Sequence, residues 1–166
     1  MRMSKESYDR LNALTAMCFN ANAVFDNLAY ALDYHYYANI SKVVHLHVAH
    51  IMPEWADIIT DKMIQLSARP VRQPIGGYDT DFESLHDVFV TMLMTLTGLR
   101  ETTRSLIESA DLDGDDEVRI FAEEFLMIIS PYIKQAEEWV NASDVLSAQD
   151  FNIHVLDYTH FIPLDN

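Results

Sequence analysis

Five side chains of types that commonly bind metals recur at steps of three and four residues between positions 47 and 61. They are His47, His50, Glu54, Asp57 and Asp61. Because residues three and four apart share one face of an α-helix, a helix over this segment would line up all five. Imidazole nitrogen and carboxylate oxygen suit iron, zinc or manganese. The stripe therefore indicates a metal-binding face, with a solvated polar face as the alternative.

Other residues of types that bind metals are less suited to a metal site by their positions in the sequence. His35 falls where the apolar stripe of the preceding segment ends, and a histidine there usually packs and hydrogen-bonds rather than binding a metal. His45 lies about 160° from His47 on a helical wheel, so it is not expected to join that site. The acidic stretch 111–117 departs from a calcium-binding loop because Gly114 stands at its fourth position. Acids at the positively polarised N-terminus of a helix are the better interpretation.

Apolar periodicity predicts the helices that must position these residues. Four amphipathic stripes are present, and four such helices form an all-α bundle. They cover residues 11–32, 42–67, 82–106 and 118–139. Ser7 is the expected cap of the first helix, and Ser41 that of the second, after a short break at Asn39 and Ile40. Pro53 cannot donate a hydrogen bond to the Ala49 carbonyl, so a kink is expected in the second helix.

The connections predict how the helices are ordered in space. The link over residues 111–117 is short and polar, so the helices that it joins should be antiparallel neighbours. The link over residues 69–81 is longer, and about 12 extended residues reach roughly 40 Å, the length of a helix of about 27 residues. This link can therefore cross the bundle to start a parallel helix, which is the ferritin-like arrangement. A plain up-down bundle is the alternative.

The chain length of 166 residues fits one domain over residues 1–166. We expect its bundle to cover about residues 7–142. The remainder, about residues 143–166, mixes aromatic residues with His154 and His160 without helical periodicity. It is expected to be an extended tail that docks on a neighbouring surface.

Composition excludes several classes of function. The formal net charge is -15, and such an acidic surface repels phosphate backbones and attracts cations, so DNA binding is not expected. A lone Cys18 supports neither an intramolecular disulfide nor a thiolate metal cluster, which favours a reducing compartment. The N-terminus has no signal-peptide pattern, and no apolar run is long enough to span a membrane. We therefore expect a cytoplasmic protein without a membrane partner.

Several short motifs carry a resemblance to a known family. The segments are His35-Tyr36 with Leu46-His47, Asp61 to Pro70, Gly114 to Asp116, and Glu138 to Ala142. The first pair is similar to a His-Trp... Leu-His signature with the same separation of the histidines. The second resembles an acid-Arg... Gly-Gly-x-Pro helix end, and the last two resemble the start and end of a final helix. Over roughly residues 8–143 the chain resembles the mini-ferritins, the DNA-binding proteins from starved cells (Dps).

This resemblance implies a homo-oligomer, a dodecameric shell built from dimers, with a ferroxidase centre at each two-fold interface. Iron(II) would be oxidised there by peroxide or oxygen and stored as a ferric mineral. Carried over, His35 and His47 would be ligands from one subunit, and Asp57 and Asp61 the carboxylate pair of its mate. On the residue pattern, His50 and Glu54 would extend the metal-binding face, and zinc is a possible second metal.

The sequence also departs from the family pattern. Alignment on His47 puts the family acids near Lys62 and Leu66, whereas alignment on Pro70 puts them on Asp57 and Asp61. The family's Lys/Arg-rich terminal tail is missing, so DNA compaction is not expected. The alternative function is therefore a non-catalytic ferritin-like structural or metal-buffering oligomer with a degenerate ferroxidase site.

Overall fold

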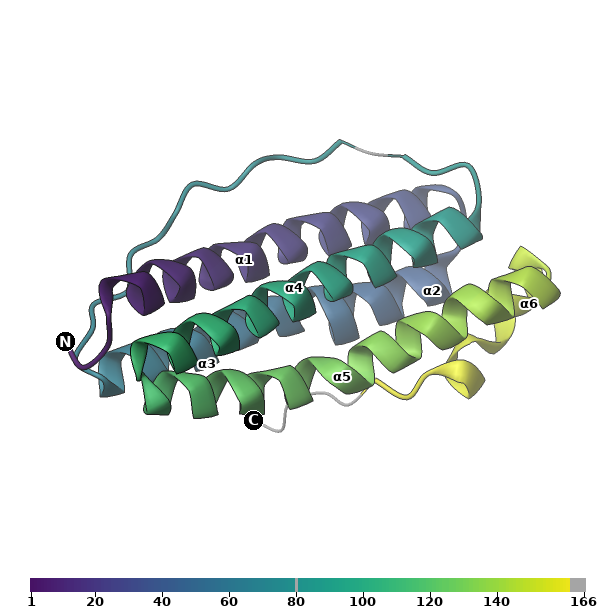
Figure 1. Cartoon of the computed structure of the whole chain (residues 1–166). Helices are drawn as coiled ribbons and strands as arrows, with labels where there is room; N and C mark the ends of the chain where they lie inside the picture. The colour runs from purple at the N-terminus through teal and green to yellow at the C-terminus, as the bar shows by residue number, and fades with distance from the viewer. Residues whose placement is uncertain (80, 162–166) are drawn as a thin grey trace.

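The part of the chain described by this computed structural model, residues 1–79 and 81–161, contains helices and irregular segments but no strand. The all-α prediction is therefore confirmed for this part (Figure 1). The elements are α1 (Lys5–Tyr34), α2 (Ala38–Val43), a π-helical turn η1 (Val44–Ala49), α3 (Ile51–Gln65), α4 (Leu85–Asp113), α5 (Asp116–Val145), α6 (Ala148–His154) and a 3-10 turn η2 (Val155–Tyr158). Within the described residues, no helix combines the length and the apolar character that crossing a membrane requires.

Four rods of helix lie side by side in a bundle: α1, the composite of α2, η1 and α3, then α4 and α5 (Figure 1). The turn between α4 and α5 is tight because Gly114 adopts the left-handed conformation, with φ of 70°. Glycine reaches this region without steric cost, which lets the chain reverse at once. The two helices are antiparallel neighbours, as the short acidic link predicts.

The connection between α3 and α4 runs along the whole length of α1 (Figure 1). Near its beginning, the Val71 N–H donates to Asn12 Oδ1 at 2.9 Å. Near its end, Asp81 Oδ1 lies 2.8 Å from Nε2 of His35, the residue that ends α1. The connection therefore returns along the bundle, and α4 runs in the same direction as α3.

The predicted start of the second helix was wrong by several residues. The break lies at Tyr36, which has a positive φ of 71°, and helix resumes at Ala38. Ser41 is not a cap: it is buried, and its hydroxyl donates to the Ala29 carbonyl at 2.7 Å. The expected break over 39–41 is therefore helical, because a buried hydroxyl satisfied by α1 does not interrupt the backbone ladder.

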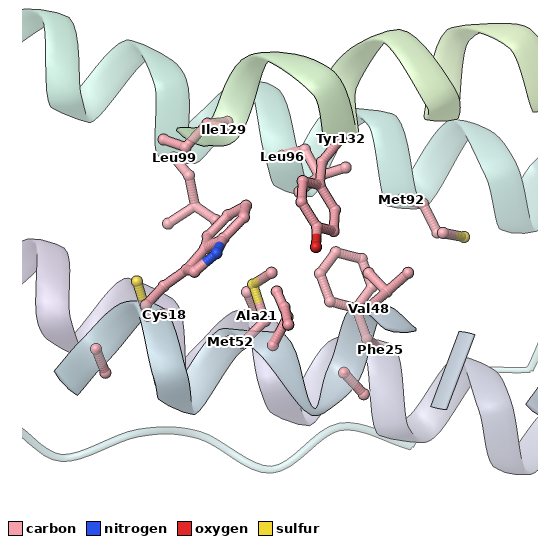
Figure 2. Packing of buried hydrophobic residues seen from close by; sticks show 14 of the residues in the cluster. Cys18, Ala21, Phe25, Val48, Met52, Met92, Leu96, Leu99, Ile129 and Tyr132 are labelled. Atoms are coloured by element: carbon pink, nitrogen blue, oxygen red, sulfur yellow. The ribbon is translucent and has the colours of Figure 1, made fainter. Parts of the chain in front are cut away.

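The centre of the bundle is filled by apolar side chains from all four rods. Figure 2 shows Cys18 and Phe25 from α1, Met52 from α3, Leu96 from α4 and Tyr132 from α5 pointing toward one another. All five are buried. Burial of this apolar surface supplies most of the driving force for the packing of the helices.

The C-terminal segment differs from the expected extended tail. α5 continues to Val145, and residues 148–158 form α6 and η2. Phe151 is fully buried between Phe89 and Trp139, with ring centroids 4.9 and 5.5 Å away. The segment docks on the chain's own bundle, and its helix is too short to produce a periodic sequence signal. Residues 162–166 of the expected tail lie outside the described residues.

The acidic turn after α4 binds the first turn of α1. Ser4, rather than the predicted Ser7, is the N-cap of α1. Asp115 Oδ2 accepts hydrogen bonds from the Ser4 N–H at 2.8 Å and from the Ser7 hydroxyl at 2.6 Å, while Asp113 accepts one from the Ser4 hydroxyl. Burial alone would raise the pKa of Asp115, but the bonds from Ser7 and Ser4 outweigh it and hold that pKa below its ordinary value.

Replacing Asp115 should therefore loosen this end of the bundle. Asp115→Ala removes two hydrogen bonds to a charged acceptor, and we expect it to lower the free energy of unfolding by about 2 kcal/mol at pH 7. The folded-state pKa is depressed, so this contribution is present above the unfolded pKa of about 3.9 and is lost as the pH falls through the folded value. Urea unfolding at pH 7 and in a pH series down to acid measures it.

Asp116→Ala is the matched control, because Asp116 is exposed and its carboxylate lies 3.7 Å from the Arg119 guanidinium, in a surface ion pair. We expect it to cost less than about 0.5 kcal/mol. Equal destabilisation by the two variants would contradict the role of Asp115 in holding the first turn of α1.

Candidate metal-binding face

A π-helical turn separates α2 from α3 and decides which side chains meet. Such a turn places residue i next to residue i+5, and the His50 N–H donates to the His45 carbonyl at 3.1 Å. Pro53 has no N–H to offer the Ala49 carbonyl. That carbonyl instead accepts a hydrogen bond from Asn22 Nδ2 of α1 at 2.8 Å. Asn22 of α1 therefore satisfies the Ala49 carbonyl, which Pro53 leaves without its usual backbone donor.

The π-helical turn separates His47 from His50, which were expected to share a face. His50 packs against His45, with ring centroids 4.3 Å apart. His45 Nδ1 in turn lies 3.3 Å from Asp26 Oδ1 of α1. His47 lines a different hollow, whose walls include Ile153 of α6. The prediction of one continuous stripe was wrong at this point, because a helical wheel assumes an uninterrupted α-helix.

The acids of the expected stripe all lie on α3 but differ in environment. Asp57 and Asp61 are exposed and lie one helical turn apart on α3, as their spacing of four residues in the sequence predicts. Glu54 is half-buried, and its Oε2 atom has no hydrogen-bond partner among the described residues. Burial, and then the charge of Glu54, raise the pKa of Tyr132 to about 12. Glu54 therefore faces toward α5, whereas Asp57 and Asp61 are open to solvent.

His35 fastens the connection that precedes α4. Its Nε2 atom lies 2.8 Å from Asp81 Oδ1, and its ring meets Phe82 edge-on at 5.1 Å. The N–H of Phe82, and then the ring of His35, hold the pKa of Asp81 below its ordinary value. Beyond its neighbour Tyr34, His35 thus contacts residues 81 and 82, whereas His47 lines a hollow together with residues of the C-terminal segment.

Across residues 1–79 and 81–161, no three His, Cys, Asp or Glu side chains are arranged to hold a metal ion. The six predicted ligands, His35, His47, His50, Glu54, Asp57 and Asp61, do not converge in a single chain. The bundle interior in Figure 2 offers no alternative, because apolar groups line it. Burial raises the pKa of the Cys18 thiol to about 12, so this residue stays a neutral, poor ligand.

Sequence reasoning missed His45 and Asp26. His45 was set aside on a regular helical wheel, and Asp26 lies on another helix. A signal was present in Pro53, which leaves the Ala49 carbonyl without its usual donor. The polar Asn22 on the facing helix could have suggested where that acceptor finds a partner.

Comparison with known proteins adds no family to this description. No protein-family model matches the chain, and no curated protein matches it. What the face can do chemically follows from its own donors, which are exposed carboxylates and imidazoles. Such donors suit iron(II), zinc or manganese when enough of them converge.

The link between Asn22 and Pro53 can be measured by a double-mutant cycle. Asn22→Ala should lower the free energy of unfolding by about 1–2 kcal/mol, because it leaves the Ala49 carbonyl unpaired. In a Pro53→Ala background, residue 53 regains an N–H that can reach this carbonyl, so the cost of Asn22→Ala should fall. Urea unfolding of the four proteins measures the coupling. If the two substitutions lowered the free energy of unfolding by strictly additive amounts, the role of Asn22 would be contradicted. Asn141→Ala, at an exposed position, serves as control.

Proposed function

We propose that this protein is a ferritin-like bundle that forms a homo-oligomer and binds iron(II) where the outer faces of two subunits meet. The observation that carries the proposal is the exposed pair Asp57 and Asp61 on α3, outside an apolar bundle. Because no three ligands converge within the described part of one chain, a complete site needs donors from a second copy. Two-fold pairing would bring such outer faces together.

The course of the chain supports the ferritin-like part of the proposal. A single long crossover between the second and third rods is typical of ferritin-like bundles, and in up-down bundles all connections are short. Here the crossover is fastened to α1 at both ends, through Asn12 with Val71 and through His35 with Asp81. Those contacts hold the crossover against α1, and the side of α3 that carries Asp57 and Asp61 is exposed.

The donor set suits iron(II) as a substrate. Asp57 and Asp61 supply hard oxygen ligands, and His47 of a neighbouring subunit supplies an imidazole nitrogen. With few protein ligands, coordination positions stay open for the oxidant. Two iron(II) ions give one electron each to hydrogen peroxide, which takes up two protons and leaves as two water molecules. His35 would take part only after leaving Asp81.

A second function is favoured by a specific observation. His35 is paired with Asp81, and His47 lines a hollow together with Ile153 of α6, so the two expected histidine ligands have different surroundings within a chain. A non-catalytic oligomer with a structural or metal-buffering role would need no such convergence. It would still attract cations through its net charge of -15.

Aerobic addition of iron(II), with and without peroxide, tests the catalytic proposal. We expect ferric absorbance to rise faster than in buffer. Combined Asp57→Asn and Asp61→Asn should slow the initial rate at least about tenfold, because the carboxylate ligands are lost. His47→Ala should slow it as well. His86→Ala is the control, since His86 pairs with Asp144 elsewhere on the bundle. A wild-type rate equal to that of buffer would rule out ferroxidase activity.

Native mass spectrometry with metal analysis separates the two functions. The iron proposal expects a closed assembly larger than a dimer, a dodecamer if it follows the mini-ferritins, that retains iron after loading. A metal-free dimer without oxidation would favour the structural alternative. Neither function includes DNA binding, and salt-sensitive retardation of DNA would contradict both.

A further inference from the structure

We propose that His45 and His50 form a separate binding site for a divalent transition metal of the zinc type, with Asp26 as a positioning residue. The site lies at the π-helical turn, where η1 packs against α1. It is independent of the proposed iron chemistry, because it uses neither His47 nor the exposed acids of α3.

The two imidazoles are already close to a chelating arrangement. Their ring centroids lie 4.3 Å apart with the ring planes at 60°. Two imidazoles bound to one zinc ion through Zn–N bonds of about 2.1 Å have centroids roughly 5 Å apart. Since His50 is exposed, a small rotation of its side chain opens the pair to that separation. The spacing of five residues brings the rings together because the backbone between them is π-helical.

Asp26 fixes which nitrogen of His45 is available. Its Oδ1 atom is inaccessible to solvent and has no hydrogen bond among the described residues, yet it lies 3.3 Å from His45 Nδ1. A buried carboxylate oxygen needs a proton donor, which favours the tautomer with the proton on Nδ1. The lone pair of Nε2 is then free to bind a metal. A carboxylate behind a ligating histidine is the usual way proteins orient such a ligand.

The site is open enough to exchange its metal with solvent. The side chains of His45 and Asp26 are 38% and 25% exposed, so the ion would enter without unfolding the turn. A surface hollow of about 530 Å³ next to His45 is lined by Tyr30, Tyr34 and Lys42, among others. Two protein ligands leave the remaining positions to water. Imidazole donors select zinc, nickel or copper over magnesium and calcium.

Titration of the metal-free full chain with zinc, followed by calorimetry and by competition with a zinc indicator, tests the site. We expect one equivalent to bind with micromolar affinity. His45→Ala and His50→Ala should each weaken this binding at least tenfold, and His45→Gln and His50→Gln should do the same while keeping a polar side chain. Far-UV circular dichroism checks that the variants fold. His86→Ala and His47→Ala are the controls, and both should leave the affinity unchanged.

Asp26→Asn tests the positioning role with a readout that a structural defect would not move. We expect about tenfold weaker zinc binding with the stoichiometry of one retained. The ¹⁵N chemical shifts of the His45 ring should show the proton on Nδ1 in the wild type and a tautomer mixture in Asp26→Asn. An unchanged tautomer and affinity would remove Asp26 from the site.

The proposal is overturned if the wild type binds no zinc at millimolar concentration, or if the His45 and His50 variants bind it as tightly as the wild type. Loss of binding in His47→Ala alone would also overturn it, by placing the ion elsewhere. Combined Asp57→Asn and Asp61→Asn should leave zinc affinity intact. Failure of the iron proposal and failure of the zinc proposal are thus distinguishable, because they appear in different variants.

Discussion

The hydrogen bond from Asn22 to the Ala49 carbonyl is the contact on which the arrangement of ligand-type residues depends. Pro53 has no N–H for this carbonyl, and a buried acceptor without a donor is costly. The side-chain amide of Asn22 in α1 donates to this carbonyl at 2.8 Å. Ala49 ends the π-helical turn, in which backbone hydrogen bonds span five residues instead of the four of an α-helix. The five-residue spacing across the turn brings the His45 and His50 rings to a centroid distance of 4.3 Å, whereas His47 lines a hollow next to the C-terminal segment. The Ala49 carbonyl and its donor thus belong to the turn that spaces these imidazoles.

The helices themselves could be predicted because apolar periodicity reports burial directly. Leu11, Phe25, Leu96 and Trp139 were assigned to core stripes, and all four are buried. The length of the link over residues 69–81 allowed a crossover, because about 12 extended residues reach along a rod, but it left the up-down bundle open. The positions of the helices depend on apolar patterns over many residues, so a local irregularity such as the π-helical turn does not change them.

The details that sequence could not supply depend on partners distant in the chain. Ser4 rather than Ser7 caps α1 because Asp113 and Asp115, more than a hundred residues later, hold that end. Ser41 is helical because the Ala29 carbonyl accepts its hydroxyl. The histidine stripe is interrupted by the π-helical turn, whose Ala49 carbonyl accepts a hydrogen bond from Asn22 of another helix. The local sequence is compatible with more than one cap and more than one helix start, and tertiary contacts determine which of them forms.

The negative charge of the chain divides into carboxylates with protein partners and carboxylates left to solvent. Within residues 1–79 and 81–161, four histidines have a ring nitrogen within 4 Å of an aspartate oxygen: His35, His45, His86 and His154. Asp115 is engaged by Ser4 and Ser7. These carboxylates hold helix ends, links and rings in place, so they are less available to attract free cations. Asp57 and Asp61 are exposed one turn apart on α3, so their carboxylates remain accessible to a cation that the acidic surface attracts.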